Sequence, residues 1–550
     1  MRRARLIWFV SREYDGIAGA GGVKDVCRQL AEELAHNDYP VRVILPRYGF
    51  FPAEAEGFAP VHIPCCQAGV LNGYAFPSVF SVDMNYTLEN RRESVGLWKK
   101  EISGVEVFLV EAERFREKLG VYTYTREEAL TNADHRQGAG HYDYFAMNIL
   151  LQKALLDLLI LFQEVPWVIH CQDGHAATLP AMMRENSGYR HYFRSTAAVV
   201  TIHNAGQGYH QEVADLDFAQ TVTGLSRQTV MAHRLGGQFN PFIASSPYAV
   251  FNTVSENYGR ELQETEEDGR TGWLGHRLKE RGIRLQGVTN GINPKAFDSR
   301  NPRVLGLDAG FDVLNGDLEG KAVCKKRMLE QVNTPRWWER VEQYGTLDIS
   351  WEQPLFSFIG RLTEQKGVDL LLQCMESFFL DHTGCGCLVL GSGDTSIEEQ
   401  IQRWTEQGQM QGRLCFLKGF DSQLANHVYA AGDFFLVPSQ YEPCGLTDYI
   451  AQLLGNLPIV HHVGGLVKVV DGETGITFSP HSHLALTEAL ERALTIYADK
   501  PRLRAMQIQA VKKIYRHHTW QQVMQQYLGL YQQAREMVCV QDTSEYSPDW

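Results

Sequence analysis

Short apolar runs rich in β-branched residues recur along both halves of the chain. In the first half they lie at 5–10, 41–45, 167–171, 197–203 and 248–254, and in the second half at 355–360, 387–391, 414–419, 434–439 and 457–462. Runs of this length, apolar at nearly every position, are typical of strands buried on both faces of a parallel sheet. Both halves are therefore predicted to contain such a sheet.

Between several of these runs the apolar positions repeat with a helical period. Val23, Val26, Cys27, Leu30 and Leu34 fall on one face, which predicts an amphipathic helix over residues 22–36. Strands alternating with helices indicate a doubly wound α/β arrangement. A chain of 550 residues is also too long for a single core. We therefore expect two such domains.

The breaks in these patterns predict the domain boundaries. The segment at 290–303, NGINPKAFDSRNPR, is rich in turn-forming residues and interrupts the periodicity. The predicted parts are an N-terminal α/β domain over 1–295 with an antiparallel insertion near 50–100, a second α/β domain over 296–505, helices over 506–540 and a flexible tail over 541–550.

Composition and charge exclude some classes of function. The net charge of −13 disfavours a nucleic-acid partner, because binders of this size are usually basic. The 11 cysteines show no zinc-ligand spacing, so we expect no metal site and reduced thiols in a cytoplasmic protein. The most apolar run, 154–162, is too short to span a bilayer and contains Asp157, so no membrane partner is expected.

In the second half, charged residues follow the predicted strands. Arg361 and Lys366 come just after the run at 355–360, and two fixed cations at a strand end suit a diphosphate. The alternative interpretation is that Arg361 and Lys366 are two solvated charges on the protein surface. Glu442 precedes the predicted helix start at 444–446, where a carboxylate accepts hydrogen bonds from sugar hydroxyls and backbone N–H groups hold phosphate.

In the first half, polar residues also follow the strands. Asp173 and His175 follow the run at 167–171, and His203 and Asn204 come at the end of the run at 197–203. A lone histidine is more often a core residue than a catalytic one, but two histidines at separate strand ends favour a functional site. The glycine-rich stretch GIAGAGGVKDV, residues 16–26, follows the first strand without a lysine among its glycines.

Taken in order, several motifs give the chain a family resemblance over nearly its whole length. They are GGVKDV, RFREKLGVYTYT, CQDGHA, TIHN, TVSENY, TNGIN, IGRLTEQKG, PSQYEPCGL, GGL and TWQQVMQQYLGLY. The chain resembles the bacterial glycogen synthases and plant starch synthases. These are retaining glucosyltransferases of the GT-B fold, in which two Rossmann-like domains face each other across a cleft.

The resemblance implies an activity and a set of site residues. It implies transfer of glucose from a nucleotide sugar, most often ADP-glucose, to an α-glucan acceptor, with no cofactor and no metal. The catalytic residues would be His203, Arg361, Lys366 and Glu442; the donor site would comprise Gly21, Gly22, Asn290, Arg361, Lys366, Glu442, Cys444, Gly445 and Leu446; Asp25, Asp173, His175 and Asn204 would line the cleft on the acceptor side.

The chain departs from the family pattern near these positions. Gly19 stands where the family has a lysine, and Asp448 stands where glutamine is usual. On the predicted helix Lys24 points off the apolar face beside Asp25, so it is not expected to replace the missing cation. Two alternatives therefore stay open: a related transferase with a different donor or acceptor, and a weakly catalytic glucan-binding relative.

Overall fold

The computed structural model describes residues 5–334, 338–406 and 410–544. The chain divides into two compact units. Unit 1 contains Met1–Val288 together with Val523–Trp550, and unit 2 contains Thr289–Gln522.

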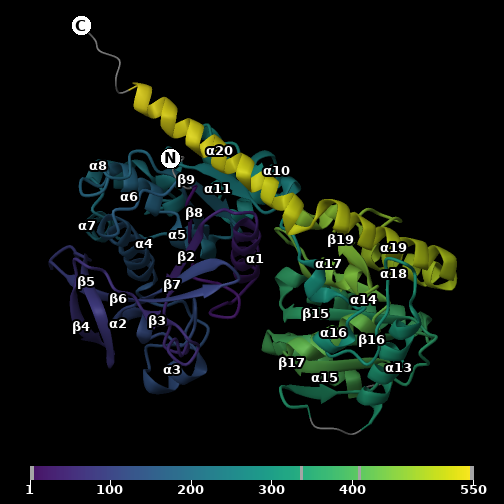
Figure 1. Ribbon diagram of the computed structural model, residues 1–550. Helices are drawn as coiled ribbons and strands as arrows, with labels where there is room; N and C mark the ends of the chain where they lie inside the picture. The colour runs from purple at the N-terminus through teal and green to yellow at the C-terminus, as the bar shows by residue number, and fades with distance from the viewer. Residues whose placement is uncertain (1–4, 335–337, 407–409, 545–550) are drawn as a thin grey trace. The chain divides into compact units, whose positions relative to one another are not determined.

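Unit 1 is built on an 11-stranded sheet that is parallel in its main part (Figure 1). Its strands run in the order β13-β12-β9-β8-β1-β2-β7-β6-β5-β4, with β3 paired to β6. Their bounds are β1 Ile7–Val10, β2 Val41–Pro46, β3 Ala59–Pro60, β4 Gln67–Leu71, β5 Tyr74–Asp83, β6 Arg92–Ile102, β7 Val105–Glu111, β8 Val168–Gln172, β9 Ala197–Ile202, β12 Val250–Thr253 and β13 Gln286–Gly287. All five apolar runs of the first half therefore form the predicted strands.

The insertion near 50–100 forms the antiparallel end of this sheet. β4, β5, β6 and β7 pair antiparallel in sequence order, as alternating exposed and buried residues along β5 predict. A separate hairpin joins β10 Arg234–Leu235 and β11 Gln238–Phe239.

Eleven α-helices lie wholly within unit 1 among the described residues. They are α1 Val23–His36, α2 Glu113–Arg116, α3 Arg126–Thr131, α4 Tyr144–Leu161, α5 Asp173–Ala176, α6 Leu179–Glu185, α7 Leu216–Thr223, α8 Arg227–Ala232, α9 Pro241–Ser245, α10 Glu256–Glu264 and α11 Leu274–Glu280. Of these, α1, α2, α4, α5 and α10 contact the sheet. The predicted apolar face of α1 is buried. α4 is long and apolar enough to cross a membrane by length and composition, but 78% of that window is buried inside the fold, as in the core helix of a soluble protein.

The strand order of unit 1 reverses between β1 and β8. From β1 the chain adds β2 and β7 on one side, whereas β8 is followed by β9 and β12 on the other. Loops at such a switch point diverge and leave a crevice at the carboxyl ends of the strands. The loops that follow β1 and β8 carry the glycine-rich stretch and Asp173.

Unit 2 repeats this architecture with a seven-stranded sheet, ordered β14-β17-β16-β15-β18-β19-β20 and parallel except for β14. The strands are β14 Val341–Tyr344, β15 Leu355–Leu362, β16 Gly386–Gly393, β17 Leu414–Gly419, β18 Phe434–Val437, β19 Leu457–His461 and β20 Ile476–Phe478. The helices are α12 Pro302–Leu305, α13 Glu319–Asn333, α14 Val368–Asp381, α15 Thr395–Glu406, α16 Ser422–Ala431, α17 Thr447–Leu453, α18 His483–Ala498 and α19 Lys500–His517.

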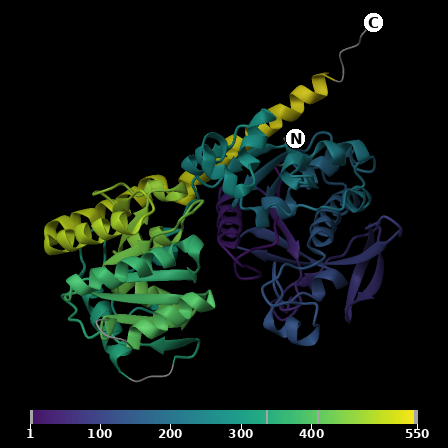
Figure 2. The same ribbon diagram turned by 180° about the vertical axis from the view of Figure 1, so that it is seen from behind.

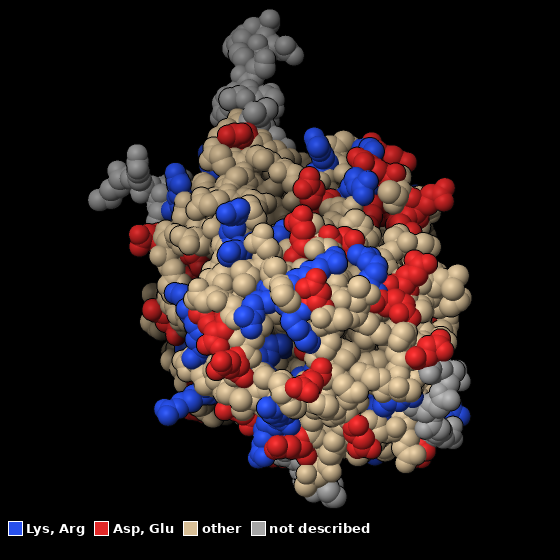
Figure 3. Space-filling model, turned by 90° about the vertical axis from the view of Figure 1, so that its right-hand side faces the viewer, with Lys and Arg blue, Asp and Glu red and all other residues tan. Residues whose placement is uncertain are grey.

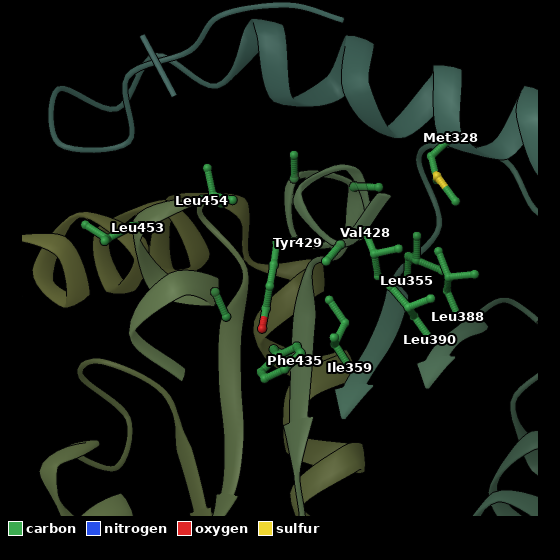
Figure 4. Close-up of a cluster of buried hydrophobic side chains, with 14 of the residues drawn as sticks. Met328, Leu355, Ile359, Leu388, Leu390, Val428, Tyr429, Phe435, Leu453 and Leu454 are labelled. Atoms are coloured by element: carbon green, nitrogen blue, oxygen red, sulfur yellow. The ribbon is translucent and has the colours of Figure 1, made fainter. Parts of the chain in front are cut away.

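Successive residues of the central strand β15 enter the cores on opposite faces of the unit 2 sheet. Leu355 and Ile359 pack with residues of α13 and α16, whereas Phe356 and Phe358 pack with α14 and α18. Figure 4 shows side chains of the first core, and Figure 2 gives the reverse view of the helices around the sheet. Burial on both faces explains the uninterrupted apolar runs.

The strand order of unit 2 reverses between β15 and β18. The loops that follow these two strands carry Arg361, Lys366 and Glu442. Both units thus place their sequence-predicted polar residues at a topological switch point, where open α/β sheets bind ligands.

The last helix, α20 Trp520–Ser544, packs against unit 1 over its later residues. The hydroxyl of Tyr531 lies 3.0 Å from Nδ1 of the buried His170 in β8. The predicted flexible tail at 541–550 begins inside this helix, and its residues 545–550 lie outside the described residues.

Acidic and basic side chains are interspersed on the face that Figure 3 shows.

Candidate functional site

The switch point of unit 2 brings Lys366 and Glu442 into direct contact. The ammonium nitrogen of Lys366 lies 2.6 Å from Oε2 of Glu442, and the Ser439 hydroxyl donates to the same oxygen at 3.0 Å. Burial alone would raise the pKa of Glu442, but the Lys366 charge and the Ser439 hydroxyl hold it below its ordinary value. Glu442 is therefore an ionised hydrogen-bond acceptor near neutral pH.

Backbone contacts fix the two loops that carry this pair. The Gln440 N–H donates to the Gln365 carbonyl at 3.0 Å. Gly367, with φ +67°, ends the turn η4 Glu364–Lys366, and a Cβ there would lie 1.9 Å from the Pro438 carbonyl oxygen. Only glycine combines this backbone angle with so close an approach. The loop after β15 is thus locked to the loop after β18.

Arg361 lies close by on the same strand end. It is the penultimate residue of β15, opposite Ser392 of β16, and its side chain is exposed. Its guanidinium has no hydrogen-bond partner among the residues that the structure describes. Arg361 is therefore available to an anionic ligand, whereas Lys366 shares its charge with Glu442.

The loop after Glu442 folds around Asn290. The backbone N–H of Asn290 hydrogen-bonds the buried Cys444 thiol. Gly445 has φ +73°, and Leu446 caps α17 at its N-terminus. Asn290 is 4% exposed, and its side-chain oxygen has no partner in the described part of the chain. A chain of contacts therefore joins five of the predicted donor-site residues: Lys366, Glu442, Cys444, Gly445 and Asn290.

A second glycine turn supports this loop from η6 Gly464–Lys468. A Cβ on Gly464 would lie 1.9 Å from the Glu442 carbonyl oxygen, and one on Gly465 would lie 2.3 Å from that of Cys444. Lys468, at the end of this turn, contacts the same loop and was not among the predicted site residues. A lysine inside the apolar run LVKVV is the sequence signal for it, since lysines are rarely buried without a partner.

In unit 1 the residues after β8 and β9 also meet. Asp173 adopts φ +54°, an uncommon conformation for a residue other than glycine. Its Oδ1 accepts hydrogen bonds from the backbone N–H groups of His203, at 2.8 Å, and Asn204, at 3.3 Å. Burial raises the pKa of Asp173 to about 8, against the effect of these two amides. Strain and a buried carboxyl at one point are typical of a functional site.

His203 and His175 are both buried and neutral. Burial lowers the pKa of His203 to about 3 and that of His175 well below its ordinary value. Nε2 of His203 lies 2.7 Å from the amide oxygen of Gln172, so this nitrogen carries the ring proton. Nε2 of His175 accepts from the Arg12 backbone N–H at 3.0 Å, so its proton lies on Nδ1. Each ring has a defined tautomer.

Glu13, a residue missed by the sequence analysis, organises the glycine-rich loop. Its Oε2 accepts from the N–H groups of Ala20, at 2.7 Å, and Gly21, at 3.0 Å, while its Oε1 accepts from the Tyr122 hydroxyl at 2.8 Å. Two amides of the loop are therefore bound to a protein carboxylate. Gly22 caps α1, and a Cβ on Gly21 would meet nothing within 4 Å, so this loop stays open on its outer side.

The stem of the Lys24 side chain lies over Gly19, a contact that the sequence analysis did not predict. A Cβ on Gly19 would lie 2.2 Å from Cδ of Lys24, so the absence of a side chain at 19 makes room for the lysine stem. Nζ of Lys24 bonds Asp25 at 2.7 Å and Asp15 at 2.9 Å. Lys24 lies on α1 as predicted. Its long side chain folds back over the glycine-rich loop and places its ammonium group between Asp15 and Asp25.

The described residues contain no group of three or more histidine, cysteine or acidic side chains arranged to hold a metal ion. The groups that the two switch points present are cations, carboxylates, neutral histidines and backbone amides. Such groups bind a diphosphate and sugar hydroxyls and stabilise charge on a leaving group.

Comparison with known proteins finds matches for both halves of the chain. Residues 6–278 match the family model described as starch synthase catalytic domain, and residues 345–513 match glycosyl transferases group 1. The chain is 29% identical to a glycogen synthase of Lacticaseibacillus casei over 93% of this chain and 96% of that protein. It is also 29% identical to a glycogen synthase of Aeromonas salmonicida over 96% of this chain and 98% of that protein.

A solved structure has the same fold. The catalytic domain of starch synthase IV from Arabidopsis thaliana, bound to ADP and acarbose, superposes with a TM-score of 0.75 and 23% identity. The match covers 97% of this chain and 99% of that one. This likeness shows the GT-B-like arrangement of two α/β sheets in separate domains.

Proposed function

Since this chain belongs to the glycogen and starch synthase family of glycosyltransferases, we propose that it transfers glucose from ADP-glucose to the non-reducing end of an α-1,4-glucan with retention of configuration. The observation that carries the proposal is the Lys366–Glu442 pair at the unit 2 switch point, with the exposed Arg361 beside it. The choice of donor and acceptor is supported by the ADP and acarbose bound in the Arabidopsis enzyme.

In this proposal the donor binds to the second domain, residues 296–505. Arg361 and Lys366 neutralise the diphosphate and stabilise the departing nucleoside diphosphate, since both cations gain strength as negative charge develops on it. Glu442 accepts hydrogen bonds from hydroxyls of the donor sugar. Lys366 then exchanges part of its contact with Glu442 for the phosphate oxygens, so donor binding rearranges an existing ion pair.

The acceptor side is assigned to the first domain, residues 1–295. His203 is neutral with its proton on Nε2, and its ring or backbone carbonyl supports oxocarbenium-like charge on the transferred glucose. Asp173 holds His203 and Asn204 by their backbone amides, and His175 and Asp25 line the acceptor side. Gly21 and Gly22 allow the main chain to approach the donor sugar.

We place the protein in the cytoplasm. Eight cysteines are buried without a disulfide bond: Cys27, Cys171, Cys324, Cys374, Cys385, Cys387, Cys415 and Cys444. Unpaired thiols suit a reducing compartment. The proposed reaction uses no cofactor, because the cations of the donor site replace a metal as the diphosphate counter-charge.

A related transferase with another nucleotide sugar is the second candidate. It is favoured by Gly19, beside which the Lys24 ammonium is paired with Asp15 and Asp25, and by Asp448 beside the donor loop. A panel of nucleotide sugars offered with and without glycogen distinguishes the two. Incorporation from ADP-glucose alone supports the first candidate, incorporation from a different donor supports the second, and no transfer from any of them argues for a weakly catalytic glucan-binding protein.

A further inference from the structure

Lys468 is almost entirely buried under the loop that follows Glu442. Its side chain is 6% exposed, and its Nζ donates to the carbonyl oxygens of Cys444, Gly445 at 2.8 Å and Gly465 at 3.2 Å. The charge is balanced by Asp448, whose fully buried Oδ1 lies 3.1 Å away. The Tyr449 ring centroid lies 4.5 Å from the same nitrogen. The ammonium group is therefore enclosed by protein atoms and is almost entirely shielded from solvent.

These contacts determine which way two peptide groups point. The peptides 444–445 and 445–446 are trans, so each carbonyl points opposite to the N–H of the next residue. Because Lys468 draws the carbonyls of Cys444 and Gly445 toward itself, the N–H groups of Gly445 and Leu446 point away from it. Neither N–H has an acceptor among the described residues.

The two amides form a small concavity for an oxyanion. Gly445 is in the left-handed region at φ +73°, and Leu446 follows at φ −113° and ψ −26°. Successive residues of opposite backbone hand turn their N–H groups toward a common point, a geometry that binds anions. The buried Asn290 lies next to this loop, because its backbone N–H bonds the Cys444 thiol.

We propose that Lys468 is a positioning residue for glucosyl transfer, which holds the amides of Gly445 and Leu446 toward the diphosphate of the donor without touching the donor itself. This inference rests on the proposed function of the unit 2 site. Asp448 is its counter-charge: it keeps the ammonium in place and prevents an unpaired buried cation. Lys468 also favours the ionised form of Glu442 through its charge.

The same unit contains a matched control. Lys321 is also buried, and its Nζ also bonds three carbonyls, those of Ala430 at 2.7 Å, Gly432 at 2.7 Å and Leu454 at 3.1 Å. These carbonyls lie at the ends of α16 and α17, away from the loop at 442–446. Lys468→Met and Lys321→Met therefore each remove a buried ammonium that bonds three carbonyls, but only the first frees the proposed amides.

The experiment measures the affinity of the folded variants for ADP, and for inorganic pyrophosphate as a probe without a base, by calorimetry. We expect Lys468→Met to raise the Kd for either probe about tenfold or more, the effect of losing preorganised charge-assisted contacts. Lys321→Met should lower the melting temperature and leave both Kd values within about twofold of the wild type, a factor that corresponds to only a few tenths of a kcal/mol.

A second variant covers the risk that Lys468→Met leaves Asp448 unpaired and does not fold. The double variant Lys468→Met with Asp448→Leu removes both charges and should show the same loss of affinity. An unchanged Kd in a folded Lys468 variant, or an equal loss in Lys321→Met, would overturn the inference. If the wild type binds pyrophosphate but not ADP, the donor proposed above is wrong, and the pyrophosphate Kd still tests the role of Lys468. If the wild type binds neither probe, the inference on Lys468 fails.

Discussion

The ammonium nitrogen of Lys366 lies 2.6 Å from Oε2 of Glu442, although 76 residues separate them in the chain. The pair joins the loop after β15 to the loop after β18 at the switch point of the unit 2 sheet. One member is a cation suited to a diphosphate, and the other is a carboxylate suited to sugar hydroxyls. The contact therefore places groups for both parts of a nucleotide sugar side by side.

The first prediction concerns the cations of this site. Lys366→Ala and Arg361→Ala should each lower kcat about a hundred- to a thousandfold, because each removes a contact that strengthens as the diphosphate leaves. Lys418→Ala is the matched control, since Lys418 lies near the end of β17 in the same sheet and pairs with a glutamate, Glu398, at 3.0 Å. Steady-state kinetics of the three variants check this. Near-normal turnover of Lys366→Ala and Arg361→Ala would refute the diphosphate assignment.

The second prediction concerns Gly464, which lets the second glycine turn approach Glu442. Gly464→Ala should lower both stability and activity, because its Cβ would lie 1.9 Å from the Glu442 carbonyl oxygen. Gly472→Ala separates this clash from backbone strain, because Gly472 also has a positive φ, +72°, and its Cβ would meet nothing within 4 Å. The control should cost only about 1–2 kcal/mol of unfolding free energy.

Chemical denaturation and kinetics of both glycine variants provide the comparison. Equal losses of stability and activity in Gly464→Ala and Gly472→Ala would contradict this prediction. They would mean that backbone strain at a positive φ, and not the close approach to Glu442, explains the need for glycine at 464.

The sequence predicted the strands, the main helices and the family, because these depend on local periodicity and on ordered motifs. It also placed candidate site residues at the strand ends that the fold brings to the two switch points. It missed Glu13 and Lys468, because their partners are backbone groups of other loops, which leave no pattern in the sequence. The position of Lys24 over Gly19 was missed for a related reason: helix periodicity places a Cβ, but a long lysine stem reaches well beyond it.

The third prediction tests this lysine with a double-mutant cycle. Gly19→Ala should displace the Lys24 stem and weaken its ion pairs with Asp15 and Asp25, at a cost of up to about 1 kcal/mol for such half-exposed pairs. In a Lys24→Ala background the same substitution should cost less, because nothing remains to be displaced. Unfolding free energies of the four proteins give the coupling. Additive effects would place Lys24 away from Gly19 in solution.

The fourth prediction is a pH dependence that originates at Asp173. Its folded-state pKa is about 8, above the ordinary value of 3.8, so between these values the folded protein holds a proton that the unfolded chain has released. Stability therefore decreases as the pH rises through this window and levels off above about 8. Asp173→Asn keeps an oxygen for the amides of His203 and Asn204, tolerates a positive φ and cannot ionise.

Melting temperatures of wild type and Asp173→Asn from pH 5 to 9 test this sign. The Asn variant should gain on the wild type as the pH rises to about 8, the folded-state pKa of Asp173. A difference that is constant with pH, or a loss of stability by the Asn variant relative to the wild type as the pH rises, would show that Asp173 is ionised in the folded protein at low pH.

The most direct test of the central claim follows the fate of glucose from labelled ADP-glucose incubated with glycogen in the presence of a chelator. The account predicts equimolar release of ADP and growth of the glucan by α-1,4-linked glucose, with the α configuration retained and no effect of the chelator. Transfer that requires a divalent metal, inversion to a β linkage, or release of ADP without extension of the glucan would contradict it.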